Sequence, residues 1–345
     1  MHVHKYLSLI ELKRIKIEMR IFMYNKKTSF ADFIVKEVCP ENKFLEEMNK
    51  VIPWHEIENW FNKKVVKKNI KVGRPSYPVI MMFKIHLIQQ WYNLSDRETE
   101  FQISDRLSFR KFLGIGIEDN VPDATTIEKF RHYLESRNAH KVLTEVLDNY
   151  FCKIGLIKKE GNLIDATFLR SKGKPHKDEE KNIDIDAQFG HKGYGYSGTI
   201  NMDEKTKLIR KTTVTSAEIL DFQSTEDVLI GDEIKVYADK GYAPARKILQ
   251  IKYPKTRFHI MYKRNRGKKG EPTPALDENK QLRNISYAKI RARVEHAFSK
   301  IKFVFKFQRL RYVGLDRVTA KFNSLCIAYN FSRLGFLMRK QGITV

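Results

Sequence analysis

The stretch NLIDATFL, residues 162–169, changes the hydrophobic pattern of the chain. Before it, apolar residues recur with a helical period of about 3.6 residues, and within it they alternate as in a strand. Both faces of this predicted strand are largely apolar, which is typical of a strand in the middle of a sheet. Asp165 interrupts one face, where an unpaired charge would be costly. The stretch therefore predicts either a bond from Asp165 to a neighbouring loop or a functional carboxylate.

Further strands and helices follow this stretch. YSGTINMD (196–203) and LIRKTTVT (208–215) predict a hairpin around the turn DEKTK, and IKVYAD (234–239) predicts a strand that ends in an acid. The segment KIRARVEHAFSKIKF (289–303) predicts a helix made almost entirely of cations and apolar residues. The second half therefore predicts an α/β fold, a mixed sheet flanked by helices.

Three acids stand out in this half, and each has an ordinary explanation when taken singly. Asp239 precedes Gly241 as in many turns, and Glu295 is spaced to pair with Arg291 one helical turn before it. Taken together, Asp165 on a first strand, Asp239 at the end of a later strand and Glu295 on a later helix form a ribonuclease-H-like carboxylate set. Crowded carboxylates require cations, and hard oxygen ligands favour Mg²⁺ or Mn²⁺.

The N-terminal half has a helical pattern from about residue 29 to 160. YPVIMMFKIHLIQQWY (77–92) predicts a helix that stops at Asn93, and Ser95 with Glu98 predicts a capping box for the next helix. Thr125 with Glu128 predicts a second box of the same kind. Successive helices with short turns fit either a helix-turn-helix that reads DNA or a small helical bundle without groove contacts.

Composition indicates a polyanionic partner. The chain has 345 residues with 65 Lys and Arg against 41 Asp and Glu, a formal net charge of +24. The apolar runs are too short and too interrupted by charges for a membrane span, and the three cysteines are far apart. We therefore expect a cytoplasmic, nucleoid-associated protein with no membrane partner. Residues 1–28 are a basic lead-in with two interpretations that stay open, a disordered arm or upstream sequence read before a start at Met19 or Met23.

Long ordered segments of the chain resemble DDE transposases encoded by bacterial insertion sequences, in the group conventionally numbered five. The resemblance covers about residues 40 to 335. Its segments are YPVIMMFKIHLIQQWYNLSDRETEFQISDRLSFRKFLGI (77–115), VPDATTIEKFRHYLE (121–135), LIDATFL (163–169), VYADKGY (236–242) and RARVEHAFSKIKFVFKFQRLRYVGL (291–315). It implies a helical DNA-binding domain over 29–160 and a ribonuclease-H-like catalytic domain with a C-terminal helix over 161–345.

The resemblance also implies the chemistry. Asp165, Asp239 and Glu295 would bind two Mg²⁺ or Mn²⁺ ions, Asp165 bridging both and each of the others ligating one. Arg291 and Lys302 match family positions on the catalytic helix, whereas Tyr287 is offset from its usual place. Relatives often carry Lys and His where this chain has Ser197 and Thr199, and His-Asp where it has Leu220-Asp221.

The resemblance implies double-stranded DNA as the partner. The protein would bind the terminal inverted repeats of its element, cleave at the ends and join them to target DNA, working as a homodimer or higher oligomer. Two alternatives stay open: a catalytically inactive or repurposed DNA-binding protein, and a stand-alone nuclease of the same fold. From residue 263 to 311 there are fifteen cations against four acids. Besides Arg291 and Lys302, the cations predicted to contact DNA phosphates are Lys263, Arg264, Arg266, Lys268 and Lys269.

Overall fold

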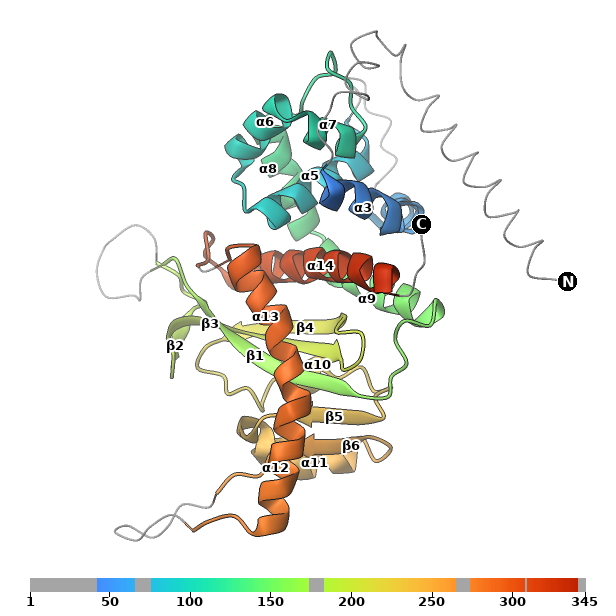
Figure 1. Ribbon diagram of the computed structural model, residues 1–345. Helices are drawn as coiled ribbons and strands as arrows, with labels where there is room; N and C mark the ends of the chain where they lie inside the picture. The colour runs from blue at the N-terminus through green and yellow to red at the C-terminus, as the bar shows by residue number, and fades with distance from the viewer. Residues whose placement is uncertain (1–41, 66–75, 174–182, 265–273, 308, 341–345) are drawn as a thin grey trace, which may run out of the picture.

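Helices fill the N-terminal half of the molecule, and a six-stranded sheet begins at Asn162. Figure 1 shows the helical part at one end, the sheet at the other, and the long helix α14 (Leu315–Lys340) between them. The computed structural model describes residues 42–65, 76–173, 183–264, 274–307 and 309–340. The predicted lead-in, residues 1–28, lies outside these ranges.

The central helix of the N-terminal half is α5 (Val79–Tyr92). From Met81 to Trp91, all of its side chains except Lys84 are buried, including the polar His86, Gln89 and Gln90. It ends where the sequence predicts, at Asn93, which adopts the left-handed conformation with φ 55°. The predicted cap at Ser95 is also confirmed, because its hydroxyl accepts a hydrogen bond from the Glu98 N–H at 3.2 Å.

The second predicted capping box is wrong. Helix α8 (Ala124–Glu135) starts before Thr125, and its cap is Asp123, whose carboxylate accepts from the Thr126 N–H at 2.6 Å. A carboxylate is at least as good an N-cap acceptor as a threonine hydroxyl and carries a charge that suits the helix dipole. The other α-helices among the described residues of this half are α3 (Lys43–Val51), α4 (Trp54–Trp60), α6 (Asp96–Asp105), α7 (Leu107–Leu113) and α9 (Ala139–Lys153).

The sheet is mixed, as the sequence predicts. Its order is β2-β3-β1-β5-β6, with β4 paired to β3 on the side away from β1. Strand β1 lies in the middle, antiparallel to β3 and parallel to β5. The predicted hairpin is confirmed as β3 and β4. The strands are β1 (Asn162–Arg170), β2 (Gln188–Gly190), β3 (Gly193–Asp203), β4 (Ile209–Ser216), β5 (Lys235–Ala238) and β6 (Arg257–Ile260).

Helices cover both faces of the sheet. One face joins the main hydrophobic core, which Leu163 and Leu169 of β1 enter together with Val294 and Ile301. The other face forms a smaller cluster around Ile164, Val228 and Leu249. Besides α14, the α-helices that the structure describes in this half are α10 (Thr225–Val228), α11 (Arg246–Lys252), α12 (Glu278–Arg291) and α13 (Glu295–Ser299).

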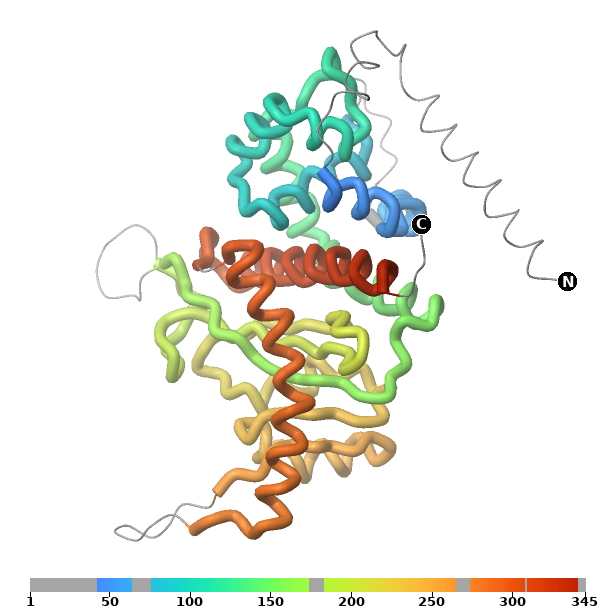
Figure 2. Tube along the Cα trace, in the orientation of Figure 1, coloured from blue at the N-terminus to red at the C-terminus, as the bar shows by residue number. Residues whose placement is uncertain are grey.

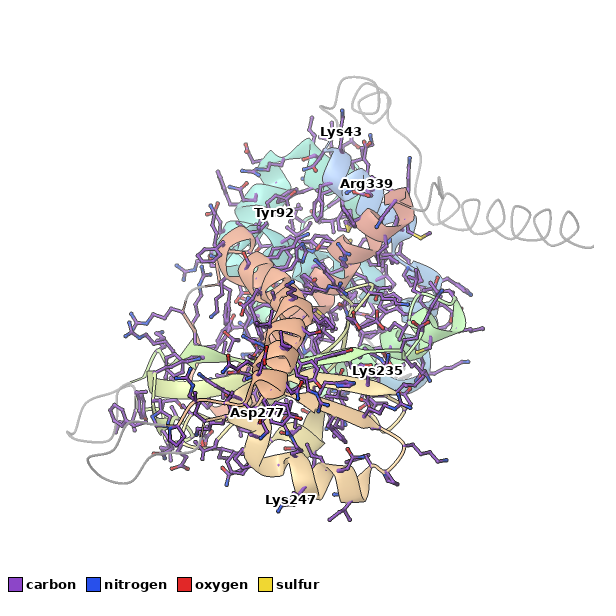
Figure 3. The ribbon with its side chains drawn as sticks, turned by 60° about the horizontal axis from the view of Figure 1, so that its bottom comes forward. Lys43, Tyr92, Lys235, Lys247, Asp277 and Arg339 are labelled. Atoms are coloured by element: carbon purple, nitrogen blue, oxygen red, sulfur yellow. The ribbon has the colours of Figure 1, made fainter. Side chains whose placement is uncertain are left out.

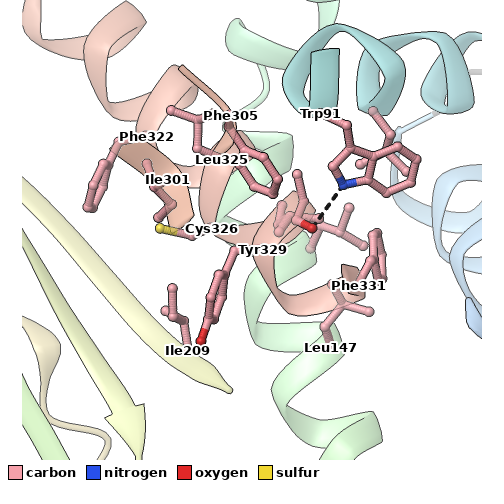
Figure 4. Close-up of a cluster of buried hydrophobic side chains, with 14 of the residues drawn as sticks. Trp91, Leu147, Ile209, Ile301, Phe305, Phe322, Leu325, Cys326, Tyr329 and Phe331 are labelled. Carbon is pink, nitrogen blue, oxygen red and sulfur yellow. Dashed lines mark hydrogen bonds between the residues drawn. The ribbon is translucent and has the colours of Figure 1, made fainter. Parts of the chain in front are cut away.

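The main core is continuous from the helical half to the sheet. In Figure 4, Trp91 of α5 and Leu147 of α9 lie against α14, and Ile209 of β4 lies on the sheet side of the same helix. The Trp91 indole donates to the Ala328 carbonyl at 3.0 Å. Buried Arg210 of β4 adds an ion pair with Asp148 of α9. The predicted domain boundary near residue 160 therefore divides the chain between two regions that share one core.

Candidate active site

The first two predicted acids lie side by side at the ends of neighbouring parallel strands. Ile164 of β1 is paired with Ala238 of β5, so continuing this register by one residue places Asp165 beside Asp239. Both acids share the parity of residues on the main-core face, Leu163 and Tyr237. Asp165 is thus held by the central strand of the sheet, and Asp239 lies next to it at the end of β5.

Glu295 reaches this place from a helix that crosses the sheet. Helix α12 continues through a 3-10 turn into α13, which Glu295 begins, and the trace in Figure 2 shows this run passing over β1 and β5. Its apolar side is buried as predicted, with Val294, Ala297 and Ile301 in the core and Ile290 packed at its edge. The opposite side of the helix presents Glu295, whose side chain is 62% exposed.

Arg291 lies between two of the acids. Its guanidinium donates to the Asp165 carboxylate at 2.8 Å and is 3.9 Å from the Glu295 carboxylate. The pairing with Glu295 that the spacing allows therefore exists, but the close partner of Arg291 is Asp165. One cation thus connects the strand acid to the helix acid.

The Asp165 carboxyl has a perturbed pKa. Burial raises it to about 6, the nearby Arg291 guanidinium opposes this rise, and the charges of Glu295 and Asp239 add to it. The negative charges of Glu295 and Asp239 thus repel the charged form of Asp165, which shows that negative charge is concentrated at this place. Perturbed acids of this kind are frequent at functional sites.

The site suits a divalent cation in its chemistry. Its donors are all carboxylate oxygens, the ligands that Mg²⁺ and Mn²⁺ prefer, and Arg291 shows that positive charge is stabilised between Asp165 and Glu295. Within the described ranges, no three acidic, histidine or cysteine side chains are close enough together to enclose an ion. Binding would therefore require Asp165, Asp239 and Glu295 to draw together as Arg291 moves aside.

The predicted DNA-contacting cations fall into three groups. Lys302 is half-buried and follows Glu295 along the same helical run: burial and Lys192 lower its pKa, while Glu295 and Asp165 oppose the change. Lys263 and Arg264 are exposed just after β6. Arg266, Lys268 and Lys269 lie outside the described residues.

Tyr287, offset from its family position, belongs to an aromatic cluster. Its hydroxyl lies 3.1 Å from Nδ1 of His259, and its ring packs against Tyr237. Through these contacts α12 packs against β5 and β6. In this structure Tyr287 is therefore a packing residue.

Two residues of the neighbourhood were not predicted as site residues. Asp221 accepts a hydrogen bond from the Ser197 hydroxyl at 3.1 Å. Tyr242 is buried near the same acids. The only sequence signal for Tyr242 was its place in the matching segment VYADKGY.

Two models of known protein families match the chain. Residues 33–133 match the model described as "Transposase domain (DUF772)", and residues 157–331, more than half of the chain, match "Transposase DDE domain". The chain belongs to the transposase DDE family. The predicted resemblance to DDE transposases is thus confirmed, whereas the particular insertion-sequence group stays a prediction.

This DDE transposase is also similar to one solved structure, described as a cryo-EM structure of the piggyBac transposase synaptic complex with hairpin DNA. Sequence identity is 11% and the TM-score is 0.42, over 88% of this chain and 76% of that one. In the described part of the transposase, no helix has the length and apolar character needed to cross a membrane.

Proposed function

We propose that this transposase binds the terminal inverted repeats of its element, cleaves DNA at the ends and joins them to target DNA. The observation that supports the proposal is that neighbouring strands bring Asp165 beside Asp239, while Arg291 lies between Asp165 and Glu295. Strands and a helix far apart in the sequence contribute these three acids.

The reaction consists of two phosphodiester exchanges. In the first, water forms a new bond to phosphorus and the 3′ oxygen leaves with a proton. In the second, that 3′-hydroxyl attacks a phosphate of target DNA, and the displaced oxygen takes the proton. Bound divalent ions would supply positive charge for the attacking and leaving oxygens.

The residues of the chain would divide the work. Asp165, Asp239 and Glu295 would hold the ions, two in number as in the carboxylate sets of this kind. In the metal-free site, the Arg291 guanidinium pairs with the Asp165 carboxylate and favours its ionised form. When metal ions bind the acids, Arg291 would be released to neutralise a DNA phosphate. Lys302, which follows Glu295 along the same helical run, would bind a second phosphate.

A strand-transfer assay tests the proposal against its two rivals. Linear DNA carrying the element ends is mixed with a target plasmid, Mg²⁺ and the full-length protein. We expect ends cleaved and covalently joined to the plasmid. Cleaved but unjoined ends would indicate a nuclease, and a shifted but intact DNA would indicate a repurposed DNA-binding protein. Joining two ends together implies at least a dimer in the working complex.

DNA binding by the transposase should weaken steeply with salt. Phosphate neutralisation releases counterions, so the slope of log affinity against log salt grows by about 0.9 per contact. Lys235 of β5 and Lys247 of α11 lie at the sheet end of the molecule (Figure 3). Fluorescence anisotropy with a labelled duplex, from about 50 to 200 mM salt, measures the slope.

One lysine exchange makes this salt test specific. Lys302→Gln should lower the slope by about one contact. Lys153→Gln, an exposed lysine at the end of α9, serves as the matched control and should leave the slope unchanged. A flat salt response of the wild type would contradict binding through phosphates, and equal slopes for both variants would remove Lys302 from the interface.

A further inference from the structure

The turn between β3 and β4 packs against α13 and α14. The Arg333 guanidinium of α14 donates from Nε to the Thr206 carbonyl at 2.7 Å. One helical turn earlier, the Tyr329 hydroxyl donates to the Lys207 carbonyl at 3.0 Å, and it lies 3.1 Å from Nδ1 of His296 in α13. The turn and the two helices therefore meet at one corner of the molecule.

Four cationic side chains gather at this corner, which we call the basic corner. They are Lys207 of the turn, His296 of α13, Lys300 one helical turn after His296, and Arg333 of α14. The π-helical turn that begins at Lys300 packs against α14. Burial lowers the pKa of all four groups, and the charge of Arg333 further lowers the pKa of the other three.

Carboxylates do not balance the charge of the basic corner. Among the residues that the structure describes, no acid forms an ion pair with any of its four side chains. Two acids of the neighbourhood are paired with other cations, Glu204 with Arg293 at 2.6 Å and Glu47 with Arg339. Partly buried cations that repel one another favour a ligand of opposite charge. The basic corner therefore suits an anion.

Arg333 presents hydrogen-bond donors at this corner. The residue is only 9% exposed, and its guanidinium lies 4.5 Å from the centroid of the Phe336 ring. Within the described part of the chain, Nε donates its only hydrogen bond, so the two terminal nitrogens have no partner. A guanidinium held by its Nε and by a ring is oriented for a phosphate, which it can bind through two parallel bonds.

The basic corner lies close to the three acids. Asp203, just before the turn, is paired with Asn162 of β1, three residues before Asp165. At about 3.3 Å per residue this separation is roughly 10 Å along the strand, about three base pairs of B-DNA. Arg293, two residues before Glu295, also pairs with an acid of the turn. A duplex bound at the acids is therefore within reach of the corner.

We propose that Lys207, Lys300 and Arg333 bind the phosphate backbone of the DNA duplex on which the acids act, a few base pairs from the reacting phosphate. The inference rests on the function proposed above, because it takes the duplex to lie at the three acids. A phosphate at the corner supplies the negative charge that its cations lack. Such contacts fix the position of a duplex and carry no sequence information.

The test is the binding of a labelled duplex carrying the element end, measured by fluorescence anisotropy on the full-length protein without divalent ions. Lys207→Gln and Lys300→Gln each remove one charge of the basic corner. Each should lower the slope of log affinity against log salt by about one contact, and the affinity about tenfold at roughly 0.1 M salt. The Tm should equal or exceed that of the wild type, because a partly buried charge beside other cations is removed.

Lys205→Gln is the matched control, since Lys205 lies in the same turn and its loss changes the net charge equally, but it pairs with Glu160. It should bind the duplex about as tightly as the wild type. Equal slopes for the three lysine variants, or a lowered Tm with unchanged affinity in Lys207→Gln and Lys300→Gln, would overturn the inference. Failure of the proposed function has a different signature. In that case the wild type would leave the ends unjoined in the strand-transfer assay, and the three lysine variants would still decide the inference.

Discussion

Asp165→Asn should abolish Mg²⁺-dependent cleavage by this transposase while its fold and its DNA binding persist. Asparagine keeps the shape of the side chain and an oxygen that can accept from Arg291, but it lacks the charge that holds a divalent ion. Because Asp165 is predicted to contact both ions, the loss should exceed the roughly 10–100-fold effect of an outer partner. Asp239→Asn should lose cleavage in the same way.

The stability of Asp165→Asn should change little. Burial already disfavours the charged form of Asp165, so neutralising it offsets the lost charge-assisted bond to Arg291. Cleavage of end-bearing DNA, thermal unfolding and a gel-shift assay measure the three properties. Asp227→Asn, at an exposed acid in α10, is the isosteric control and should cleave normally. Cleavage by Asp165→Asn with Mg²⁺ as the only metal would disprove its assignment.

The elements of the fold with strong local signals could be predicted from the sequence. The alternation around Asp165, the hairpin and the end of α5 at Asn93 each depend on residues within one strand, one turn or one cap. Such signals act over a few residues, so periodicity and turn chemistry are enough to detect them. The start of α8 was misplaced because two adjacent positions, Asp123 and Thr125, both offer a capping oxygen.

The contacts that define the site could not be predicted in this way. The closest partner of Arg291 is Asp165, 126 positions away in the chain, whereas the local rule favoured Glu295. The depth of Asp165 below the surface, which raises its pKa, depends on helices that pack over β1. The gathering of cations at the basic corner is likewise a property of the folded environment. The places of the three acids on the predicted elements, together with the resemblance, predicted the triad, whereas the electrostatics of the site depend on the tertiary structure.

Glu295→Gln distinguishes a metal ligand from a surface ion pair. As the i+4 partner of Arg291 at 3.9 Å, with its side chain 62% exposed, Glu295 would contribute only about 0.3–0.5 kcal/mol to stability. The glutamine variant should therefore fold and melt almost like the wild type. As the third ligand, Glu295 is needed for the charge that the ion requires, so cleavage and strand transfer should fall by orders of magnitude.

The control for Glu295→Gln is a second acid on the continuous helix formed by α12 and α13, at a position away from the triad. Glu278 is exposed in the first turn of α12, so Glu278→Gln loses at most a small favourable interaction with the helix dipole and should transfer strands normally. Thermal unfolding with and without Mn²⁺ gives an independent measurement, because an ion that binds the folded state raises Tm. Glu295→Gln should lose most of that rise and Glu278→Gln should keep it. Equal turnover and an equal rise in Tm for the two variants would make Glu295 a surface partner of Arg291, and the proposed metal site would lose its third ligand.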